Sequence, residues 1–364
     1  MFQSKTLLVV GAGASCEAGF PSGEELKVKI ANILDIRFDD WGSRLVSGDY
    51  RMVEAFRQAA QDAGDPRASI NPYLHKAWRI RDVVPAAAIS IDNFLDAHRG
   101  DALMELCGKL GIVKSILDAE RSSKFRAHRE GDSTFRLNDL LGTWYVGFLQ
   151  MLTEGITKDD VGQIFENLSI ITFNYDRCIE RFLYQALADY YELHEAEAQH
   201  LVSKLKIYHP YGKVGQLPWQ SNVGAVPFGS EHANLIELSK QIKTFTEGLD
   251  DAQLRGGIHE AVGDAEVIVF LGFAFHPLNM ELLTPGHPTA VQRVYATTLG
   301  LSDSDEAVIE DDIQRMLGLD DLAFHDDPRL KPDMAKLKCG EFFRHYFRSI
   351  SAAPIREEQP KPPL

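Results

Sequence analysis

The chain of 364 residues is poor in cysteine and in positive charge, and it lacks a long apolar run. Its four cysteines (Cys16, Cys107, Cys178 and Cys339) form no C-x-x-C pair, which excludes a zinc ribbon and a disulfide framework. A net charge of −15 without a Lys/Arg run argues against direct nucleic-acid binding. No apolar stretch reaches the roughly 20 residues of a membrane helix, and the N-terminal run is too short for a signal peptide. We therefore expect a cytoplasmic protein that binds neither nucleic acid nor membrane.

Short apolar runs of strand length alternate with amphipathic stretches along the chain. The runs lie at 6–10, 168–172, 205–208, 266–271 and 293–297. They are continuous rather than alternating, which is typical of strands buried on both faces. Because strands that alternate with helices form parallel sheets, the sequence predicts an α/β fold with a Rossmann-like parallel sheet.

A long helical pattern separates the first predicted strand from the others, since apolar residues recur there three and four positions apart. We therefore expect a large helical insertion after the first strand and a helical C-terminal segment. The expected parts are a Rossmann-like domain of 1–25 and 165–300, a helical insertion of 26–164, a C-terminal helical segment of 301–352 and a flexible tail of 353–364.

The insertion leaves the sheet directly after the first predicted strand, at the edge where α/β sheets bind ligands. We therefore expect it to close one wall of the ligand pocket. Residues 91–94 (IDNF) are a candidate contact with the ligand. Equally, this segment could simply start a helix that Ser90 or Asp92 caps.

Glycines follow the first predicted strand, in GAGAS at residues 11–15. Glycine lets the backbone approach a phosphate closely, and the helix that follows offers unpaired N–H groups. A tight strand-to-helix turn also needs glycine for purely steric reasons. Cys16 stands where the common dinucleotide fingerprint has its third glycine. The turn favours nucleotide binding, but not in the ordinary dehydrogenase manner.

A second motif, TFNYD at 172–176, follows the second predicted strand. Asn174 and Asp176 stand two residues apart at the carboxyl end of that strand, where open α/β sheets bind ligands. An amide and a carboxylate there could bind ribose hydroxyls and a carboxamide. The alternative is that either residue merely caps the next helix.

Two further turns follow predicted strands. In YHPYGK at 208–213, His209 is a natural general base near neutral pH, although a lone histidine is more often structural. In GFAFHPLN at 272–279, Gly272 and Phe273 are expected to line a ligand site. His276 and Asn279 could equally shape that turn.

These four motifs, in this order and each after a strand, resemble the sirtuin family, and most of all the sirtuin-like proteins of bacterial antiphage defence systems. The resemblance covers about 1–25 and 165–300 and implies NAD⁺ as the ligand. It implies that the diphosphate is held by Gly11, Ala12, Gly13 and Ser15, and that Thr172, Gly272 and Phe273 belong to the same NAD⁺ site.

The resemblance also implies catalytic roles. Asn174 would position the nicotinamide ribose and an attacking water, Asp176 would bind near the nicotinamide, and His209 would accept the proton. Family members usually place the catalytic histidine directly before a glycine, where this chain has Tyr211. Which of His209 and Tyr211 occupies the general-base position is therefore open.

The function that the resemblance implies is NAD⁺ glycohydrolysis, with antiviral defence by NAD⁺ depletion as its biological role. Such an activity must be silent until triggered, so we expect a homo-oligomer or a partner such as a HerA-type hexameric ATPase. The alternatives are an NAD-dependent protein deacylase, which needs zinc-ribbon cysteines that this chain lacks, and a non-catalytic nucleotide-binding assembly module. No metal is expected, since His194 and His200 fall on different faces of a helix.

Overall fold

The computed structural model describes residues 2–41, 44–65, 67–126, 134–221, 223–318 and 331–353. One sheet of six parallel strands runs through it, in the order β5-β4-β1-β6-β7-β8. The strands are β1 (Thr6–Val10), β4 (Leu168–Thr172), β5 (Lys206–Tyr208), β6 (Val267–Leu271), β7 (Arg293–Thr297) and β8 (Asp333–Ala335). In chain order of the sheet strands this is the 3-2-1-4-5-6 arrangement of the Rossmann fold. The predicted α/β class with a Rossmann-like parallel sheet is confirmed.

Continuous apolar runs form the central strands, because both faces of the sheet are covered. Every residue of β1 and β6 is buried, and β4 has the single partly exposed residue Ser169. The predicted bounds of β1, β4 and β7 match the structure, and β5 and β6 each begin one residue later than predicted. The edge strand β8 was not predicted, because its three residues, DMA, are too few to show a period.

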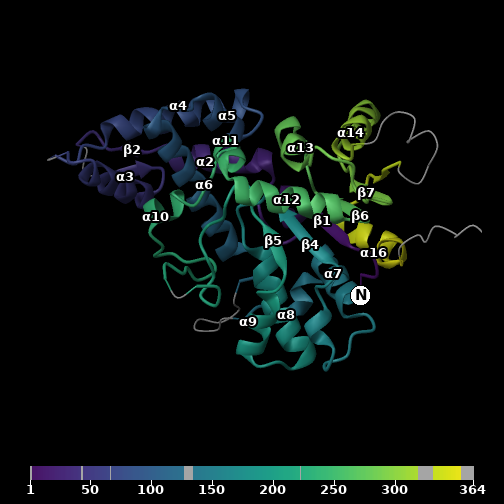
Figure 1. Cartoon of the computed structure of the whole chain (residues 1–364). Coiled ribbons are helices and arrows are strands. Elements are labelled where there is room, and N and C mark those ends of the chain that lie inside the picture. The colour runs from purple at the N-terminus through teal and green to yellow at the C-terminus, as the bar shows by residue number, and fades with distance from the viewer. Residues whose placement is uncertain are drawn as a thin grey trace, which may run out of the picture.

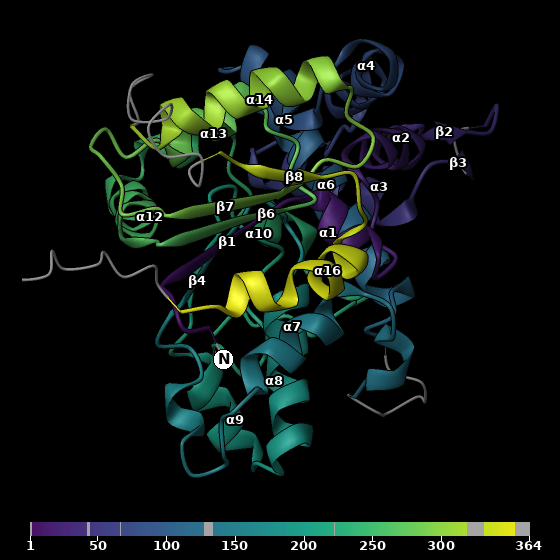
Figure 2. The same ribbon diagram turned by 90° about the vertical axis from the view of Figure 1, so that its right-hand side faces the viewer.

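Helices cover both faces of the sheet (Figure 2). One face carries α12 (Ala252–Asp264), α13 (Pro277–Leu283) and α14 (Asp303–Met316). The other carries α7 (Trp144–Thr153), α8 (Cys178–Tyr191) and α16 (Cys339–Ser351), with α9 (Glu195–Val202) packed on α8. Trp144 joins α7 to the site region, because its indole Nε1 donates to Ala14 O at 3.0 Å. Although α7 falls within the predicted insertion of 26–164, it lies on one face of the sheet.

The rest of the 26–164 segment forms a helical body beside the sheet (Figure 1). Its elements are α2 (Gly23–Leu34), β2 (Arg37–Phe38), β3 (Leu45–Ser47), α3 (Tyr50–Asp62), α4 (Asn71–Ala87), α5 (Ile91–Ala97) and α6 (Ala102–Ser122). The short β2–β3 hairpin was not expected. Ser22 and Glu25 form a capping box that starts α2, and α2, α4 and α6 pack on one another. The remaining short helices are α1 (Ala12–Cys16), η1 (Leu137–Leu140), η2 (Val161–Gln163), α10 (Leu235–Ser239) and α11 (Phe245–Asp250).

A buried ion pair joins the insertion to the sheet. Arg177, which directly precedes α8, contacts Glu120 of α6 through two hydrogen bonds of 2.9 and 2.5 Å, and neither side chain is exposed to solvent. Arg177 also donates to Val226 O at 2.6 Å and to Pro227 O at 3.3 Å, and Glu120 accepts from Gly229 N at 2.8 Å. Three segments that are distant in sequence therefore meet at one pair of charges.

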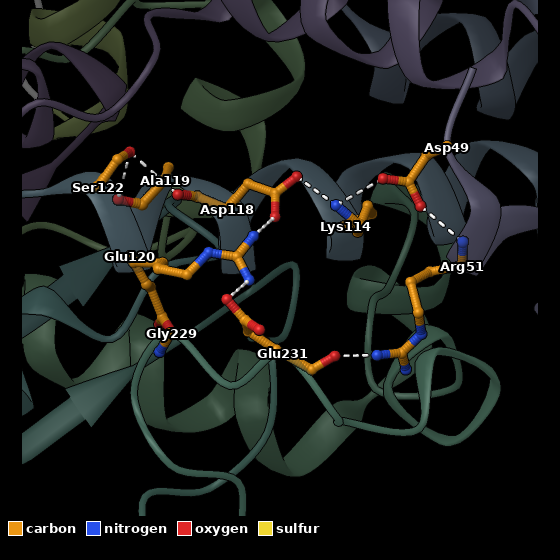
Figure 3. A network of polar contacts seen from close by, with 10 residues as sticks. Asp49, Arg51, Lys114, Asp118, Ala119, Glu120, Ser122, Gly229 and Glu231 are labelled. Carbon is orange, nitrogen blue, oxygen red and sulfur yellow. Dashed lines mark hydrogen bonds and ion pairs between the residues drawn. The ribbon is translucent and has the colours of Figure 1, made fainter. Parts of the chain in front are cut away.

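A more exposed network continues this contact along α6 (Figure 3). Lys114 lies between Asp49 and Asp118, at 2.9 and 2.5 Å, and Arg121 reaches Glu231 at 2.8 Å. Exposed ion pairs each contribute only about 0–1 kcal/mol. The Arg121–Glu231 pair links the 229–234 segment to α6, and the buried pair of Arg177 and Glu120 supplies the stronger constraint.

The turns after β1 and β6 touch through glycine. Gly11 N donates to Leu271 O at 2.9 Å and Gly13 N to Gly272 O at 3.0 Å. A Cβ on Gly11 would lie 2.4 Å from Gly272 O, which no real contact allows. Gly272 has a φ of +54°, and a Cβ there would lie 2.2 Å from Ala14 N. Packing is therefore by itself a sufficient reason for glycine at positions 11 and 272.

Two remaining expectations concern the ends and the surface of the chain. Among the residues described, no helix combines the length and the apolar character that crossing a bilayer requires. The tail predicted at 353–364 lies, apart from Ala353, outside the described residues. The predicted domain boundaries stay predictions.

We expect Gly11→Ala to lower the free energy of unfolding by about 1–3 kcal/mol, the usual cost of overpacking, because the backbone of Gly272 cannot move aside. Gly256→Ala is the matched control, since Gly256 lies in α12 with open space around its Cβ position. It should be neutral or stabilise by about 0.4–1 kcal/mol. Urea unfolding followed by circular dichroism measures both, and equal stabilities would contradict the packing role.

Candidate functional site

A cavity of about 430 Å³ opens at the carboxyl ends of β1, β4 and β6. Ligands bind open α/β sheets at this place, where the direction of strand connection reverses. Residues that follow the strands and line it include Gly11, Ala12, Ser15, Phe173, Asn174, Tyr175, Asp176, Phe273 and Ala274. The insertion contributes Ile89, Ser90, Asp92, Asn93 and Ile116. The insertion therefore forms one wall of this cavity, and the identity of the cavity as the NAD⁺ pocket stays a prediction.

Asn174 is held in one orientation. Its Nδ2 donates to Gly11 O and to Ser15 Oγ, both at 3.0 Å. A carbonyl oxygen can only accept a hydrogen bond, so the NH₂ group must face Gly11 and the side-chain oxygen Oδ1 must point away from it. Oδ1 receives no hydrogen bond from the described residues. Asn174 therefore offers a hydrogen-bond acceptor on the cavity wall.

Asp176 supports this arrangement from behind. Its Oδ2 accepts from Ser15 Oγ at 2.8 Å, and its Oδ1 accepts from Cys178 N at 3.0 Å. The second contact satisfies a free N–H at the start of α8, although the N-cap residue of this helix is Arg177 rather than Asp176. Burial raises the pKa of Asp176, against these hydrogen bonds. Both of its oxygens are engaged, although the side chain also lines the cavity.

The other residues expected at the NAD⁺ site divide into two groups. Gly11, Ala12, Ser15 and Phe273 line the cavity. Gly13 and Gly272 lie behind it, where they pack against each other. Thr172 also lies outside the lining, and its Oγ1 accepts from Asn174 N at 3.3 Å. The roles of all these residues in binding NAD⁺ stay predictions.

His209 is not among the residues that line the cavity. Its side chain is 9% exposed and points to Glu180 of α8, with Nε2 at 3.1 Å from Oε1. Its Nδ1 lies 3.4 Å from Asn174 O. His209 therefore contacts the backbone of Asn174 from behind the cavity wall, and its predicted role as general base stays a prediction.

Tyr211 lies on the cavity wall in its place. Its hydroxyl donates to Asn279 Oδ1, and its ring packs 5.7 Å from that of Phe173. Burial raises the pKa of Tyr211 far above its usual value, so this hydroxyl stays protonated and cannot act as a base near neutral pH. Tyr211 can shape the cavity and donate a hydrogen bond.

Sequence reasoning missed Tyr175 and left 91–94 open between two roles. In the structure Ser90 caps α5, because its Oγ accepts from Asn93 N at 3.1 Å, while Asp92 and Asn93 line the cavity. The capping by Ser90 is therefore confirmed, and contact of residues 91–94 with a ligand stays a prediction. Tyr175 donates its hydroxyl proton to Asp92 Oδ1 across the gap between sheet and insertion. Only the position of this tyrosine within the motif at 172–176 hinted at its role.

His276 and Asn279 hold similar double roles. His276 caps α13 by accepting from Leu278 N at 3.4 Å, and its ring lines the cavity together with Asn279. Burial lowers the pKa of His276, so the neutral ring is favoured. Within the described part of the chain, no group of three or more His, Cys, Asp or Glu side chains is placed to hold a metal ion.

Comparisons with known proteins give a weak likeness to solved structures. No protein-family model matches the chain, and no curated protein matches it. The chain is similar to a solved structure described as the crystal structure of a Sir2 homolog–NAD complex, at 13% sequence identity and a TM-score of 0.37. The match covers 96% of this chain and 92% of the other. A likeness of this strength transfers no function.

Glu180 provides a pH-dependent measure of the structure behind the site. Burial alone would raise its pKa, but Lys213 at 2.5 Å and His209 outweigh this and hold the pKa of Glu180 well below its ordinary value of 4.5. Between the folded and the unfolded pKa only the unfolded chain binds the proton, so acid favours unfolding. The stabilisation is present above about pH 4.5 and is lost as the pH falls through the folded pKa.

We therefore expect Glu180→Gln to be less stable than wild type at neutral pH, and this difference to shrink as the pH falls below about 4.5. Thermal unfolding between pH 3 and 7 measures it. Glu195→Gln, an exposed change in the first turn of α9, should differ from wild type by no more than about 0.5 kcal/mol at any pH. A Glu180→Gln difference that stayed constant with pH would contradict the assigned pairing.

Proposed function

We propose that the protein is an NAD⁺ glycohydrolase, which cleaves NAD⁺ to nicotinamide and ADP-ribose. The observation that carries the proposal is the fixed Oδ1 of Asn174, an acceptor on the wall of a cavity at the carboxyl ends of β1, β4 and β6. Such an acceptor can bind a ribose hydroxyl and orient a water molecule. The turn at 11–15 would hold the diphosphate, as the resemblance to sirtuins implies.

The chemistry fits a cavity of this kind. Nicotinamide departs with the electron pair of the bond between C1′ and its ring nitrogen, and this leaves an oxocarbenium-like ribose. Fixed acceptors near that ribose stabilise its developing positive charge, because they need no reorganisation during the reaction. Asn174 is fixed by two donated hydrogen bonds, to Gly11 O and to Ser15 Oγ, and Asp176 in turn holds Ser15.

The second candidate is a non-catalytic nucleotide-binding assembly module. One observation favours it, namely that the histidine expected as the base does not line the cavity. Within the part of the chain that the structure describes, no contact favours a protein deacylase. An assay of NAD⁺ binding and of nicotinamide release on the same protein separates the module from the hydrolase.

The wider role rests on the resemblance alone. We propose that the hydrolysis serves antiphage defence by depleting NAD⁺, and that the protein works as a homo-oligomer in the cytoplasm. A HerA-type hexameric ATPase is the proposed partner that would hold the activity silent until infection. The fold and the cavity support the NAD⁺ chemistry and are neutral on these points.

We expect Asn174→Ala to lower the rate of nicotinamide release on the order of 10²–10³-fold, as loss of one preorganised polar group does in other enzymes. Asn167→Ala is the matched control, because Asn167 Nδ2 also donates to a backbone carbonyl, Phe2 O at 3.0 Å, but at the opposite edge of the sheet. Chromatography of the products measures both. Wild-type rates in Asn174→Ala would reject the proposed function.

The same assay ranks the two candidates for the base position. We expect His209→Ala to retain turnover within about tenfold, because a general base must reach its proton directly or through one water. Tyr211→Phe should be mild as well, since it removes only the hydrogen bond to Asn279. A folded His209→Ala variant that binds NAD⁺ but releases no nicotinamide would show instead that His209 is the base.

A further inference from the structure

Three carboxylates line the cavity, and they differ in availability. Asp176 uses both of its oxygens to hold Ser15 and the start of α8. Glu24 lies in the first turn of α2 with 77% of its side chain exposed, at the solvent side of the cavity. Asp92, from the second position of α5, is surrounded by protein and only partly accessible through the cavity. Asp92 is therefore the shielded carboxylate that remains available.

Asp92 is held from the opposite wall. The hydroxyl of Tyr175, in the turn after β4, donates to Asp92 Oδ1. No side chain among the described residues donates to Oδ2. Tyr175 directly follows Asn174, so the residue that presents the acceptor and the residue that fixes the carboxylate come from one turn. The carboxylate of Asp92 and the amide of Asn174 therefore line one cavity, and the contact with Tyr175 fixes their relative positions.

We infer that Asp92 is the general base of the proposed hydrolysis, supplied by the helical insertion, and that Tyr175 positions it. The inference rests on the proposed function. In the step, the bond between C1′ and the nicotinamide nitrogen breaks and its electron pair leaves with nicotinamide. A water oxygen forms the new bond to C1′, and the Asp92 carboxylate accepts the proton of that water. Asn174 orients the water.

The surroundings tune Asp92 for this work. Burial raises its pKa above the ordinary value of 3.8, against the hydrogen bond from Tyr175. A raised pKa brings a carboxylate closer to the working pH, where a general base is most effective. The other titratable groups that line the same cavity are Glu24, Tyr175, Asp176, Tyr211 and His276. Glu247 and Lys109 lie on α11 and α6, which pack against α5. His276 stays in place in every variant below, so its titration is common to all of them.

The test compares Asp92→Asn with wild type in NAD⁺ binding by calorimetry and in nicotinamide release as a function of pH. We expect a kcat loss of about 10²–10⁴-fold with the dissociation constant of NAD⁺ within about threefold. The rise of the rate with pH that marks ionisation of the base should disappear. Asp101→Asn is the control, since Asp101 caps α6 outside the cavity and asparagine caps equally well.

Two further variants separate a chemical from a structural role. Azide needs no base, so it should attack C1′ in Asp92→Ala, give ADP-ribosyl azide and restore nicotinamide release by at least about tenfold. Azide should not rescue Asn174→Ala. Tyr175→Phe removes a donor to the carboxylate, so the rise with pH should shift to higher pH while the plateau rate stays within about tenfold of wild type.

The outcomes separate this inference from the proposed function. Wild-type protein that releases no nicotinamide rejects both. Active wild type with Asp92→Asn within about threefold of its rate, or with a loss caused only by weaker NAD⁺ binding, overturns the role of Asp92 alone. An inactive Asp92→Ala that azide does not rescue also overturns it. Loss of kcat with azide rescue and unchanged binding supports it.

Discussion

The buried pair of Glu120 and Arg177 is the contact on which the site depends. Both side chains are fully excluded from solvent, and Arg177 follows Asp176 directly in the chain. Removal of one partner would leave an unpaired buried charge, at a cost of about 3–5 kcal/mol. Because Glu120 lies on α6 and Arg177 lies between β4 and α8, the pair fixes the insertion relative to the turn that carries Asn174. Because α5 packs on α6, the same pair constrains where Asp92 lies relative to Asn174.

The sequence predicted the structure best where the position of a residue depends on a single strand. The runs at 6–10 and 168–172 became β1 and β4 with the predicted bounds, because strands buried on both faces are continuously apolar. Asn174 and Asp176 then had to reach the ligand edge, since parallel strands bring their carboxyl ends to one edge of the sheet. The sequence suggested phosphate binding for the glycines at 11 and 13, but close packing against Gly272 already explains both.

The sequence was least informative where two distant segments meet. His209 and Tyr211 follow the three-residue edge strand β5, and no periodicity shows which of them faces the cavity. The orientation of His209 is set by Glu180, because this buried carboxylate pairs with His209 and Lys213, so the histidine side chain points away from the cavity. Glu180 is separated from His209 by 29 positions and lies on a helix. The sequence likewise left residues 91–94 open between ligand contact and a helix start. The partner of Asp92, Tyr175, is 83 positions away, so no local pattern could reveal their contact.

The polarity of the cavity bears on the class of reaction. Two polar groups on its inner wall are acceptors, namely Asn174 Oδ1 and the Asp92 carboxylate, whereas the Tyr211 hydroxyl already donates to Asn279. Acyl transfer requires preorganised donors around a developing oxyanion. Glycosidic cleavage develops positive charge on the sugar and requires acceptors. The two fixed acceptors therefore fit the proposed glycosidic cleavage, because the charge that they stabilise has the sign that this reaction creates.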